Sequence, residues 1–171
     1  DHGVSARRPG EPGRAPGPGA PGSPAAQAAR QLLSEGRLAA VRQLQADESV
    51  PAALEGLVAA ACRLLGVPSG QVSVLSEVQL VAAGAGVASA TVGTTGPLDD
   101  SLCTLTAADR SPLALPDARL DERASSLGPV AGGTVRAYLG VPLLDPDGEV
   151  LGSLCVYDRE PREWTAGDFT T

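Results

Sequence analysis

The strongest constraint on the fold is an alternating segment in the last third of the chain. From Val135 to Leu143, apolar side chains occupy every second position, which is the period of a β-strand with one buried face. Residues 145–148 read Asp-Pro-Asp-Gly, and these residue types favour a tight turn. Residues 150–157 are apolar on both faces, as expected of a strand in the middle of a sheet. The segment therefore predicts an antiparallel hairpin with a central second strand.

A helical pattern lies further upstream. Six apolar side chains recur at three- and four-residue spacing and share one face of a helix: Leu54, Leu57, Val58, Ala61, Cys62 and Leu65. Ser49 is its predicted N-cap, and Gly66 follows its predicted end. Beyond Pro68 the period changes from 3.6 to 2, so residues 72–74 and 79–83 predict a second hairpin.

The middle of the chain predicts shorter elements. Asp99 or Asp100 is the expected N-cap of a short helix that runs to Arg110. The other segments are a loop at residues 84–96, a brief strand at 113–115 and a long polar loop at 117–133. Long loops in compact domains are often functional, so the last of these is a candidate part of a site.

The ends of the chain differ from this body. Residues 1–24 contain 6 Pro and 6 Gly and are predicted to be a disordered linker or tail. Residues 25–46 predict an N-terminal connecting helix whose thin apolar stripe suits either packing on the domain or pairing with a second copy. Residues 47–171 form the predicted domain. Thr165 caps a final helix that the chain end truncates, which indicates a fragment of a longer protein.

The amino-acid composition excludes several kinds of catalytic and metal-binding site. All 13 basic residues are Arg, and the one His is His2 in the tail. The body therefore has no candidate for a Lys Schiff base, His catalysis or a His metal site. The formal charge of −7 argues against a nucleic-acid or anionic-membrane partner, and no apolar run approaches the ~20 residues of a membrane span. Three widely spaced Cys residues favour a reducing cytoplasm.

Five short motifs in this order resemble those of a GAF domain of the bacterial signalling type, over residues 37–171. They are Pro-Leu-Asp-Asp-Ser-Leu-Cys (97–103), Leu-Pro-Asp-Ala-Arg (115–119), Arg-Ala-Tyr-Leu-Gly-Val-Pro-Leu (136–143), Gly-Ser-Leu-Cys-Val-Tyr-Asp (152–158) and Pro-Arg-Glu-Trp-Thr (161–165). The resemblance implies an α+β, PAS-like fold with a central antiparallel sheet of about five to six strands flanked by helices. It also implies a non-catalytic sensory or regulatory domain. Such a domain binds a small molecule or partner and controls an attached phosphatase, histidine kinase or cyclase by helix repacking.

This chain lacks the residues with which members of that family bind three classes of ligand. Cyclic-nucleotide-binding members of that family share an Asn-Lys…Phe…Asp-Glu signature. This chain has no Asn or Lys, and its one Phe is Phe169. Bilin-binding members attach the pigment through a Cys, often beside a His, and no His lies near a Cys here. Haem would have only a Cys thiolate as axial ligand. We therefore expect no cofactor, no metal and a small-molecule ligand that the sequence does not identify.

The candidate ligand pocket contains polar and thiol side chains from four segments. Cys103 lies in the first turn of a predicted helix, where the helix dipole favours a thiolate. The long loop contributes acidic and basic side chains, for which surface ion pairs are the simpler interpretation. The predicted pocket residues are Ser101, Cys103, Asp117, Arg119, Arg136, Tyr138 and Cys155.

Two other functions stay open at this point. A thiol-redox sensor, or an enzyme similar to the GAF relative that reduces methionine sulfoxide, would use Cys103 and Cys155, although buried Cys residues are more often small core side chains. A ligand-free scaffold would fill its pocket with Leu102, Leu139 and Leu154. The other predicted partners are the attached effector and a second copy bound through the terminal helices.

Overall fold

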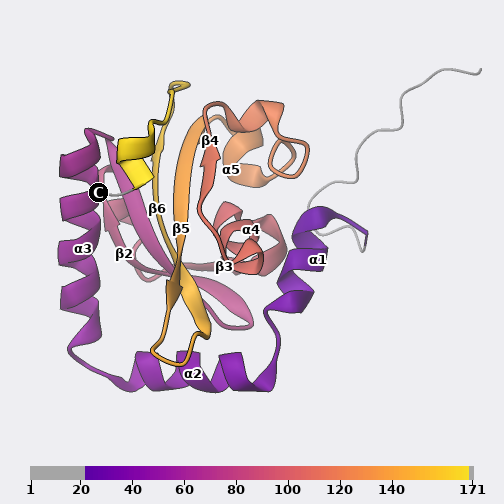
Figure 1. The fold of residues 1–171 in the computed structure, drawn as a ribbon, viewed down its shortest axis with the longest axis vertical. Helices are drawn as coiled ribbons and strands as arrows, with labels where there is room; N and C mark the ends of the chain where they lie inside the picture. Colours follow the sequence, from indigo (N-terminus) through magenta and orange to yellow (C-terminus); the bar gives the residue numbers. More distant parts are fainter. Residues whose placement is uncertain (1–21, 170–171) are drawn as a thin grey trace, which may run out of the picture.

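The computed structural model describes residues 22–169, and an antiparallel sheet lies at its centre (Figure 1). In spatial order its six strands are β3 (Thr95–Pro97), β2 (Val78–Ala85), β1 (Ser69–Leu75), β6 (Val150–Asp158), β5 (Ala137–Leu144) and β4 (Leu113–Leu115). The predicted fold class, an antiparallel sheet of about five to six strands flanked by helices, is confirmed.

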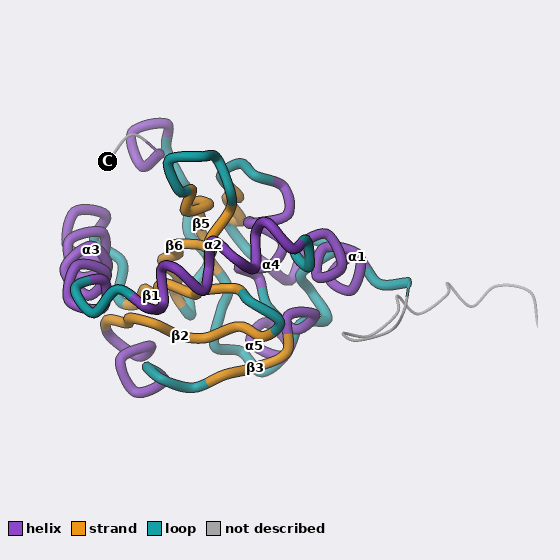
Figure 2. Tube along the Cα trace, turned by 90° about the horizontal axis from the view of Figure 1, so that it is seen from below, coloured by secondary structure: helices purple, strands orange, loops and turns teal. Residues whose placement is uncertain are grey.

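Helices cover both faces of this sheet. α3 (Val50–Leu65) packs on one face against β1, β2 and β6. α4 (Leu102–Asp109) packs on the other face, with α5 (Gly128–Ala131) on the same side and α1 (Pro24–Gln31) on the outside of α4. α2 (Glu35–Ala46) crosses one end of the sheet and joins the two helical layers, as Figures 1 and 2 show.

Four 3₁₀ turns complete the described chain: η1 (Gly86–Thr91), η2 (Leu98–Asp100), η3 (Ala118–Leu120) and η4 (Ala166–Phe169). The predicted loop at 84–96 thus contains η1 and the start of β3, and the loop at 117–133 contains η3 and α5.

The central hairpin forms where the alternation predicts it. Gly148 donates its backbone N–H to the Asp145 carbonyl oxygen (3.0 Å) and has φ 86°, a left-handed conformation that glycine adopts without strain. β6 lies between β1 and β5, and α3 and α4 cover its two faces. Val156 packs on the α3 side and Cys155 on the α4 side. The apolar character of both faces is therefore explained.

α3 follows its sequence pattern in part: Leu54, Ala61, Cys62 and Leu65 are half-buried, whereas Leu57 is 43% exposed. α3 ends at Gly66, which has φ 63° and closes the helix with a left-handed residue. Ser49 precedes the helix as predicted, but its hydroxyl donates to the Asp47 carboxylate (2.6 Å) instead of accepting from the helix backbone. Val58 is fully buried against the sheet, whereas Leu64 on the outer side is 64% exposed.

The single connecting helix predicted at residues 25–46 is wrong: the chain forms two helices, α1 and α2, separated by a bend. Leu32 at the bend is buried against Leu75 and Val150. Arg37 on α2 donates its guanidinium to the Leu32 carbonyl oxygen, which the end of α1 leaves without a helical partner. Burial of Leu32 and this hydrogen bond offset the loss of helix continuity. Both helices pack on their own domain.

The N-cap predicted for the short helix is also wrong. Ser101 caps α4, and its hydroxyl oxygen accepts from the Cys103 backbone N–H (3.1 Å). Asp100 belongs to η2 and accepts from the Gly128 backbone N–H (2.8 Å). Its carboxylate therefore joins η2 to α5 instead of capping α4. A serine directly before the helix accepts from the free backbone N–H groups of the first helical turn, as an aspartate cap would.

The predicted ends of the chain are described only in part. Of the Pro- and Gly-rich segment predicted at residues 1–24, residues 1–21 lie outside the described part of the chain. At the other end the chain forms only the 3₁₀ turn η4 after Thr165, and residues 170–171 lie outside the described part.

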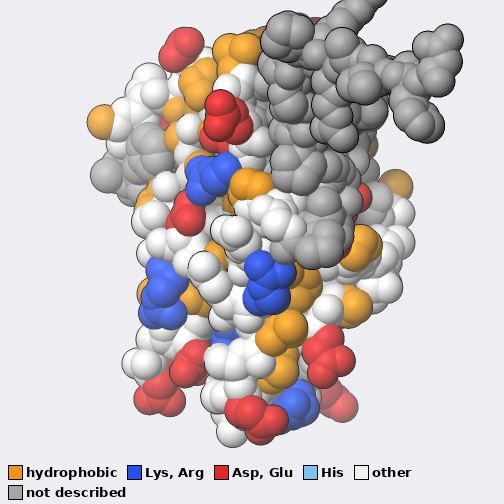
Figure 3. All heavy atoms as spheres, turned by 90° about the vertical axis from the view of Figure 1, so that its right-hand side faces the viewer, with side chains coloured by type: hydrophobic (Ala, Val, Ile, Leu, Met, Phe, Trp, Pro, Cys, Tyr) orange, Lys and Arg blue, Asp and Glu red, His pale blue; other side chains and the backbone are white. Residues whose placement is uncertain are grey.

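The described surface has mixed charge. On the face in Figure 3, Arg side chains alternate with Asp and Glu side chains and do not gather into one basic patch. Among the helices of residues 22–169, none combines the length and the apolar character that crossing a membrane requires.

Candidate functional site

The two faces of the sheet differ in chemistry. On β1, Val72 and Val74 pack towards α3 and α2. Gln71 and Ser73, which alternate with these valines, lie on the α4 side of the sheet. Ser73 is fully buried there. Apolar and polar residues alternate in β1, but the polar face of this strand is buried and does not face solvent.

A cavity of about 390 Å³ lies on this polar face, between the sheet and α4. Its volume is within the range of roughly 300–1,000 Å³ that small-molecule pockets occupy. Its walls mix apolar, hydroxyl, amide and thiol groups from all the central strands. The lining residues are Gln71, Gln79, Val81, Val87, Thr91, Thr94, Asp100, Ser101, Leu102, Cys103, Pro129, Thr134, Val135, Tyr138, Cys155, Tyr157 and Arg159.

At the inner end of the cavity lies a group of residues that we call the sulfur cluster: Cys103, Thr106, Tyr138, Ser153 and Cys155. The two sulfurs are 3.7 Å apart, and the Tyr138 hydroxyl donates to Cys103 Sγ over 3.8 Å. When Tyr138 donates to Cys103, its Oη accepts from Thr106 Oγ1 (2.8 Å); when Tyr138 instead donates to Thr106, Thr106 donates to the Leu102 carbonyl oxygen (3.2 Å). α4, β5 and β6 each contribute to this cluster.

The two thiols of the cluster have opposite pKa shifts. The pKa of Cys103 is lowered, chiefly because the Cys155 thiol donates a hydrogen bond to its thiolate, and burial opposes this effect. Hydroxyls of Ser73, Ser153 and Tyr138 add to the stabilisation of the Cys103 thiolate. The pKa of Cys155 is raised well above its ordinary value by the same hydrogen bond and by burial. Within the pair, Cys103 therefore loses its proton more readily than Cys155.

Two further features fit a thiolate at this position. Cys103 lies in the first turn of α4, where the helix dipole stabilises negative charge. Ser153 Oγ is buried and has no hydrogen-bond partner in the neutral cluster. Burial also raises the pKa of Tyr138, which keeps its hydroxyl protonated as a donor.

The outer end of the cavity is polar. Ser101 donates to the Gln79 side-chain oxygen, which places an amide beside the N-terminus of α4. Asp100 and Arg159 are the charged side chains in its wall. The cavity therefore offers hydrogen-bonding groups at its mouth and sulfur at its inner end.

The structure brings four of the seven predicted pocket residues together: Ser101, Cys103, Tyr138 and Cys155 all line the cavity. The other three, Asp117, Arg119 and Arg136, do not line it. Local hydrogen bonding holds them elsewhere, so their predicted placement needs correction.

Asp117 and Arg119 pair with each other across η3. The Arg119 guanidinium and the Asp117 carboxylate are 2.6 Å apart, and Arg119 is 53% exposed. The Arg119 side chain lowers the pKa of Asp117, and Arg136 adds a smaller electrostatic effect in the same direction. Arg136 itself donates to the Val130 carbonyl oxygen (2.6 Å). Exposed ion pairs of this kind contribute little to stability.

Sequence reasoning missed several lining residues, above all Gln71, Gln79 and Arg159. Gln71 directly precedes the strand predicted at residues 72–74, and the period of 2 puts it on the same face as Ser73. That pattern was compatible with a solvent-facing side chain, and only the position of α4 shows that the face is internal. Tyr157 was similarly detectable as the same-face neighbour of Cys155.

The scaffold alternative, with a pocket filled by leucines, does not fit this cavity. Leu102 lines it, but Leu139 and Leu154 pack on the α3 side of the sheet. Among residues 22–169, no group of three or more His, Cys, Asp or Glu side chains could hold a metal ion.

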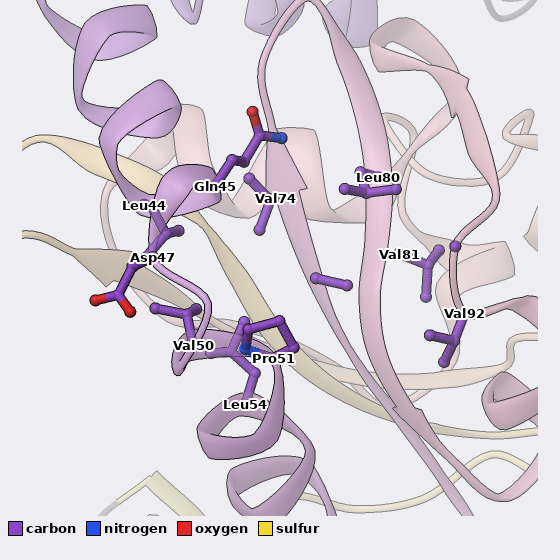
Figure 4. A pocket seen from close by; sticks show the side chains of 12 residues that line it. Leu44, Gln45, Asp47, Val50, Pro51, Leu54, Val74, Leu80, Val81 and Val92 are labelled. Atoms are coloured by element: carbon purple, nitrogen blue, oxygen red, sulfur yellow. The ribbon is translucent and has the colours of Figure 1, made fainter.

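A second cavity of about 420 Å³ lies at the junction of α2, α3 and β2 (Figure 4). Its wall is almost entirely apolar, with side chains such as Leu44, Leu54, Val74 and Leu80. Without hydrogen-bonding groups that converge on one point, it lacks the means to orient a ligand.

Comparison with known proteins identifies related domains. The model of the GAF domain family matches residues 49–170. A cyclic di-GMP phosphodiesterase from Pseudomonas aeruginosa is 42% identical over 67 residues, which is 39% of this chain and only 11% of that protein's length.

Solved structures show the same fold. The GAF domain of an Acinetobacter phosphoenolpyruvate-protein phosphotransferase has a TM-score of 0.61 at 20% identity, covering 82% of this chain and 84% of that one. The GAF-B domain of DevS from Mycobacterium smegmatis has a TM-score of 0.54 at 26% identity, covering 70% and 82%. A free methionine-R-sulfoxide reductase from Neisseria meningitidis has a TM-score of 0.56 at 18% identity, covering 83% and 81%. This last likeness shows the fold alone.

Proposed function

This chain belongs to the GAF family, and from that premise we propose that it is a non-catalytic sensory domain that binds a small molecule in the cavity beneath α4 and controls an attached effector. The observation that carries the proposal is the cavity itself, which combines apolar walls with amide, hydroxyl and thiol groups. The likeness to a cyclic di-GMP phosphodiesterase supports a role in signalling.

The ligand that suits this cavity is a small, mainly uncharged molecule with several hydrogen-bonding groups. Gln71 and Gln79 offer amides that both donate and accept, and Tyr157 adds a hydroxyl. The wall has one carboxylate and one guanidinium, Asp100 and Arg159, so it does not select strongly for either sign of charge. A ligand with an apolar body and polar edges would satisfy both kinds of surface.

Transmission of the signal would follow α4. Leu102 and Cys103 line the cavity and belong to the same buried cluster as Ala25 and Ala28 of α1. A ligand that shifts α4 changes the surface on which α1 packs. Two arrangements of α1 with different ligand affinity would provide the population shift that a regulatory domain requires.

Native mass spectrometry of the freshly purified protein tests the binding step, followed by thermal unfolding with the compound that it identifies. Val87→Trp blocks the cavity from an exposed position and should abolish the ligand-induced rise in Tm. Val78→Trp is the matched control, because Val78 is similarly exposed on β2 but does not line this cavity. Equal ligand responses in the two variants would place binding elsewhere and overturn the proposal.

Hydrogen exchange tests the transmission step. Ligand binding should change the exchange rates of the α1 amides along with those of α4. Protection confined to the cavity walls, with α1 unchanged, would argue against α1 as the output element.

A further inference from the structure

The inner end of the cavity holds two thiols in van der Waals contact, and the proposed ligand binding does not require such a pair. Cys103 and Cys155 lie on different elements, α4 and β6, and are both nearly completely buried. Both line the cavity, so a small molecule inside it reaches both sulfurs without unfolding.

We infer that Cys103 and Cys155 form a redox pair, in which a hydroperoxide that enters the cavity oxidises Cys103 and Cys155 then closes a disulfide. The inference goes beyond the proposed ligand sensing, because it depends on the two sulfurs and holds whether or not a ligand is bound. It assigns Cys103 as the residue that attacks the peroxide and Cys155 as the resolving residue.

Geometry supports disulfide formation. The sulfurs are 3.7 Å apart, and a disulfide bond measures about 2.05 Å, so they must approach by only about 1.7 Å. Ser73 and Ser153, which pair with each other across β1 and β6, are the small side chains beside the sulfurs. The adjacent cavity leaves room for α4 to move.

The surrounding hydroxyls support the assignment of Cys103 as the attacking group. Tyr138 donates to Cys103 Sγ, whereas Cys155 has no hydroxyl donor among the described hydrogen bonds. Ser153 Oγ is buried without a partner, and a negative charge on Cys103 would give its proton an acceptor. The pKa shifts of the two thiols agree with this asymmetry.

The proposed chemistry has two steps. The Cys103 thiolate attacks the distal peroxide oxygen, so that the S–O bond forms and the O–O bond breaks; the sulfur loses two electrons, and the alkoxide or hydroxide takes up the proton that Cys103 released. Cys155 then attacks Cys103 Sγ, so that the S–S bond forms, the S–O bond breaks and hydroxide leaves with the Cys155 proton as water. A dithiol reductant returns both residues to thiols.

The test uses the protein of residues 1–171 and hydrogen peroxide. After brief exposure, remaining thiols are alkylated under denaturing conditions, and peptide mass spectrometry locates the products. We expect one cross-link between Cys103 and Cys155 that dithiothreitol reverses. Persistence of Cys103 and Cys155 as thiols after Cys62 has been oxidised would overturn the inference, as would a cross-link that includes Cys62.

Three variants distinguish the roles. Cys155→Ser should stop the reaction at a sulfenic acid on Cys103, which dimedone traps. Cys62→Ser is the matched control and should leave the cross-link unchanged, because Cys62 packs on the α3 side of the sheet. Ser153→Ala should slow oxidation of Cys103 about tenfold or more, the effect of losing one hydrogen bond to a charged group. An unchanged rate in Ser153→Ala together with oxidation of Cys155 before Cys103 would contradict the assignment of Cys103.

The pH dependence of alkylation provides a second readout of Ser153. The titratable groups that face Cys103 are Cys155 and Tyr157 on β6 and Tyr138 on β5, with Asp100 and Arg159 in the same cavity wall. In the parent protein the midpoint for Cys103 should lie below that of an ordinary thiol, and Ser153→Ala should raise it. A merely structural role for Ser153 would leave the midpoint where it is.

Discussion

Two buried polar groups in this domain differ in how completely they are hydrogen-bonded. The first is the Arg37 cluster, in which the guanidinium of α2 faces the carbonyl oxygens of Leu32, Leu75, Ser76 and Val150. The second is the sulfur cluster beneath α4. Each is covered by one helix and closed by the central strands. Their hydrogen bonding nevertheless indicates different roles.

Arg37 is only 3% exposed and has no carboxylate within ion-pair distance in the described chain. Burial lowers its pKa, the Glu149 carboxylate opposes this effect, and the guanidinium stays protonated. Four carbonyl oxygens from three parts of the chain take up its donors. A buried charge so fully paired holds parts of the fold together and offers nothing to a ligand.

The sulfur cluster is less complete. Ser153 Oγ and the nearby Thr104 Oγ1 lack hydrogen-bond partners, and the sulfurs are weak donors and acceptors. Unpaired buried hydroxyls cost stability, and Ser153 is one that lies beside Cys103. The fully paired Arg37 thus joins parts of the fold, whereas the incompletely paired sulfur cluster borders the cavity.

The largest expected effect comes from removing the Arg37 guanidinium. Arg37→Met leaves buried carbonyl oxygens without donors and should lower the free energy of unfolding by about 3 kcal/mol, as measured by urea denaturation. The matched control is Arg42→Met on the exposed side of the same helix, where a change within about 0.5 kcal/mol is expected. Similar losses in both variants would show that helix α2, and not the Arg37 cluster, determines the effect.

A smaller effect is expected from crowding the sulfur cluster. A Cβ at Gly140 would lie 2.4 Å from Tyr138 Oη and 2.8 Å from Thr106 Oγ1. Because the Tyr138 ring is fully buried and cannot swing away, Gly140→Ala should cost about 2 kcal/mol of unfolding free energy. Thermal or urea unfolding measures the loss.

Gly96→Ala on β3 is the control for crowding, because a Cβ there meets no atom within 4 Å. It should change stability by no more than about 0.5 kcal/mol. If Gly140→Ala proved as mild as Gly96→Ala, the Tyr138 hydroxyl could not lie over Gly140, and the geometry of the sulfur cluster would need revision.

Sequence predicted the parts of the fold whose cause is local. The β5–β6 hairpin follows from alternation and from the Asp145–Gly148 turn, and α3 follows from its apolar face and Gly66. The bend between α1 and α2 is only partly local in cause: Ser34 is the N-cap of α2, and Arg37 donates to the nearby Leu32 carbonyl oxygen. The bend also depends on Arg37, whose partners Leu75 and Val150 lie 38 and 113 residues away. Ser34 and Gly36 also have lower helix propensity than the Ala and Leu residues on either side.

The candidate site was predictable to a similar extent. The resemblance in motif led to Ser101, Cys103, Tyr138 and Cys155, which do share a cavity. The contact between Cys103 and Cys155 joins residues 52 apart and depends on how α4 sits on β6. Asp117 was placed in the pocket because its loop is long and polar, but its short-range hydrogen bonds to Arg119 explain it without a ligand.

The finest test compares two buried threonines on α4, Thr104 and Thr106. Thr106 Oγ1 is hydrogen-bonded to Tyr138 Oη and to the Leu102 carbonyl oxygen, whereas Thr104 Oγ1 has no partner. Replacing each by the isosteric Val removes one hydroxyl without creating a cavity. Thr106→Val should cost about 1 kcal/mol of unfolding free energy, since it also leaves the Tyr138 hydroxyl with only a sulfur acceptor.

Thr104→Val should have the opposite sign. It removes an unpaired buried hydroxyl and should raise the unfolding free energy by up to about 1 kcal/mol. Urea unfolding of the two variants at one pH measures both signs. Because the two substitutions are chemically identical and two residues apart on one helix, their difference isolates hydrogen bonding from packing and helix propensity. If both destabilised equally, Thr104 would have a partner such as a bound water, and incomplete pairing would be confined to Ser153, beside the thiols.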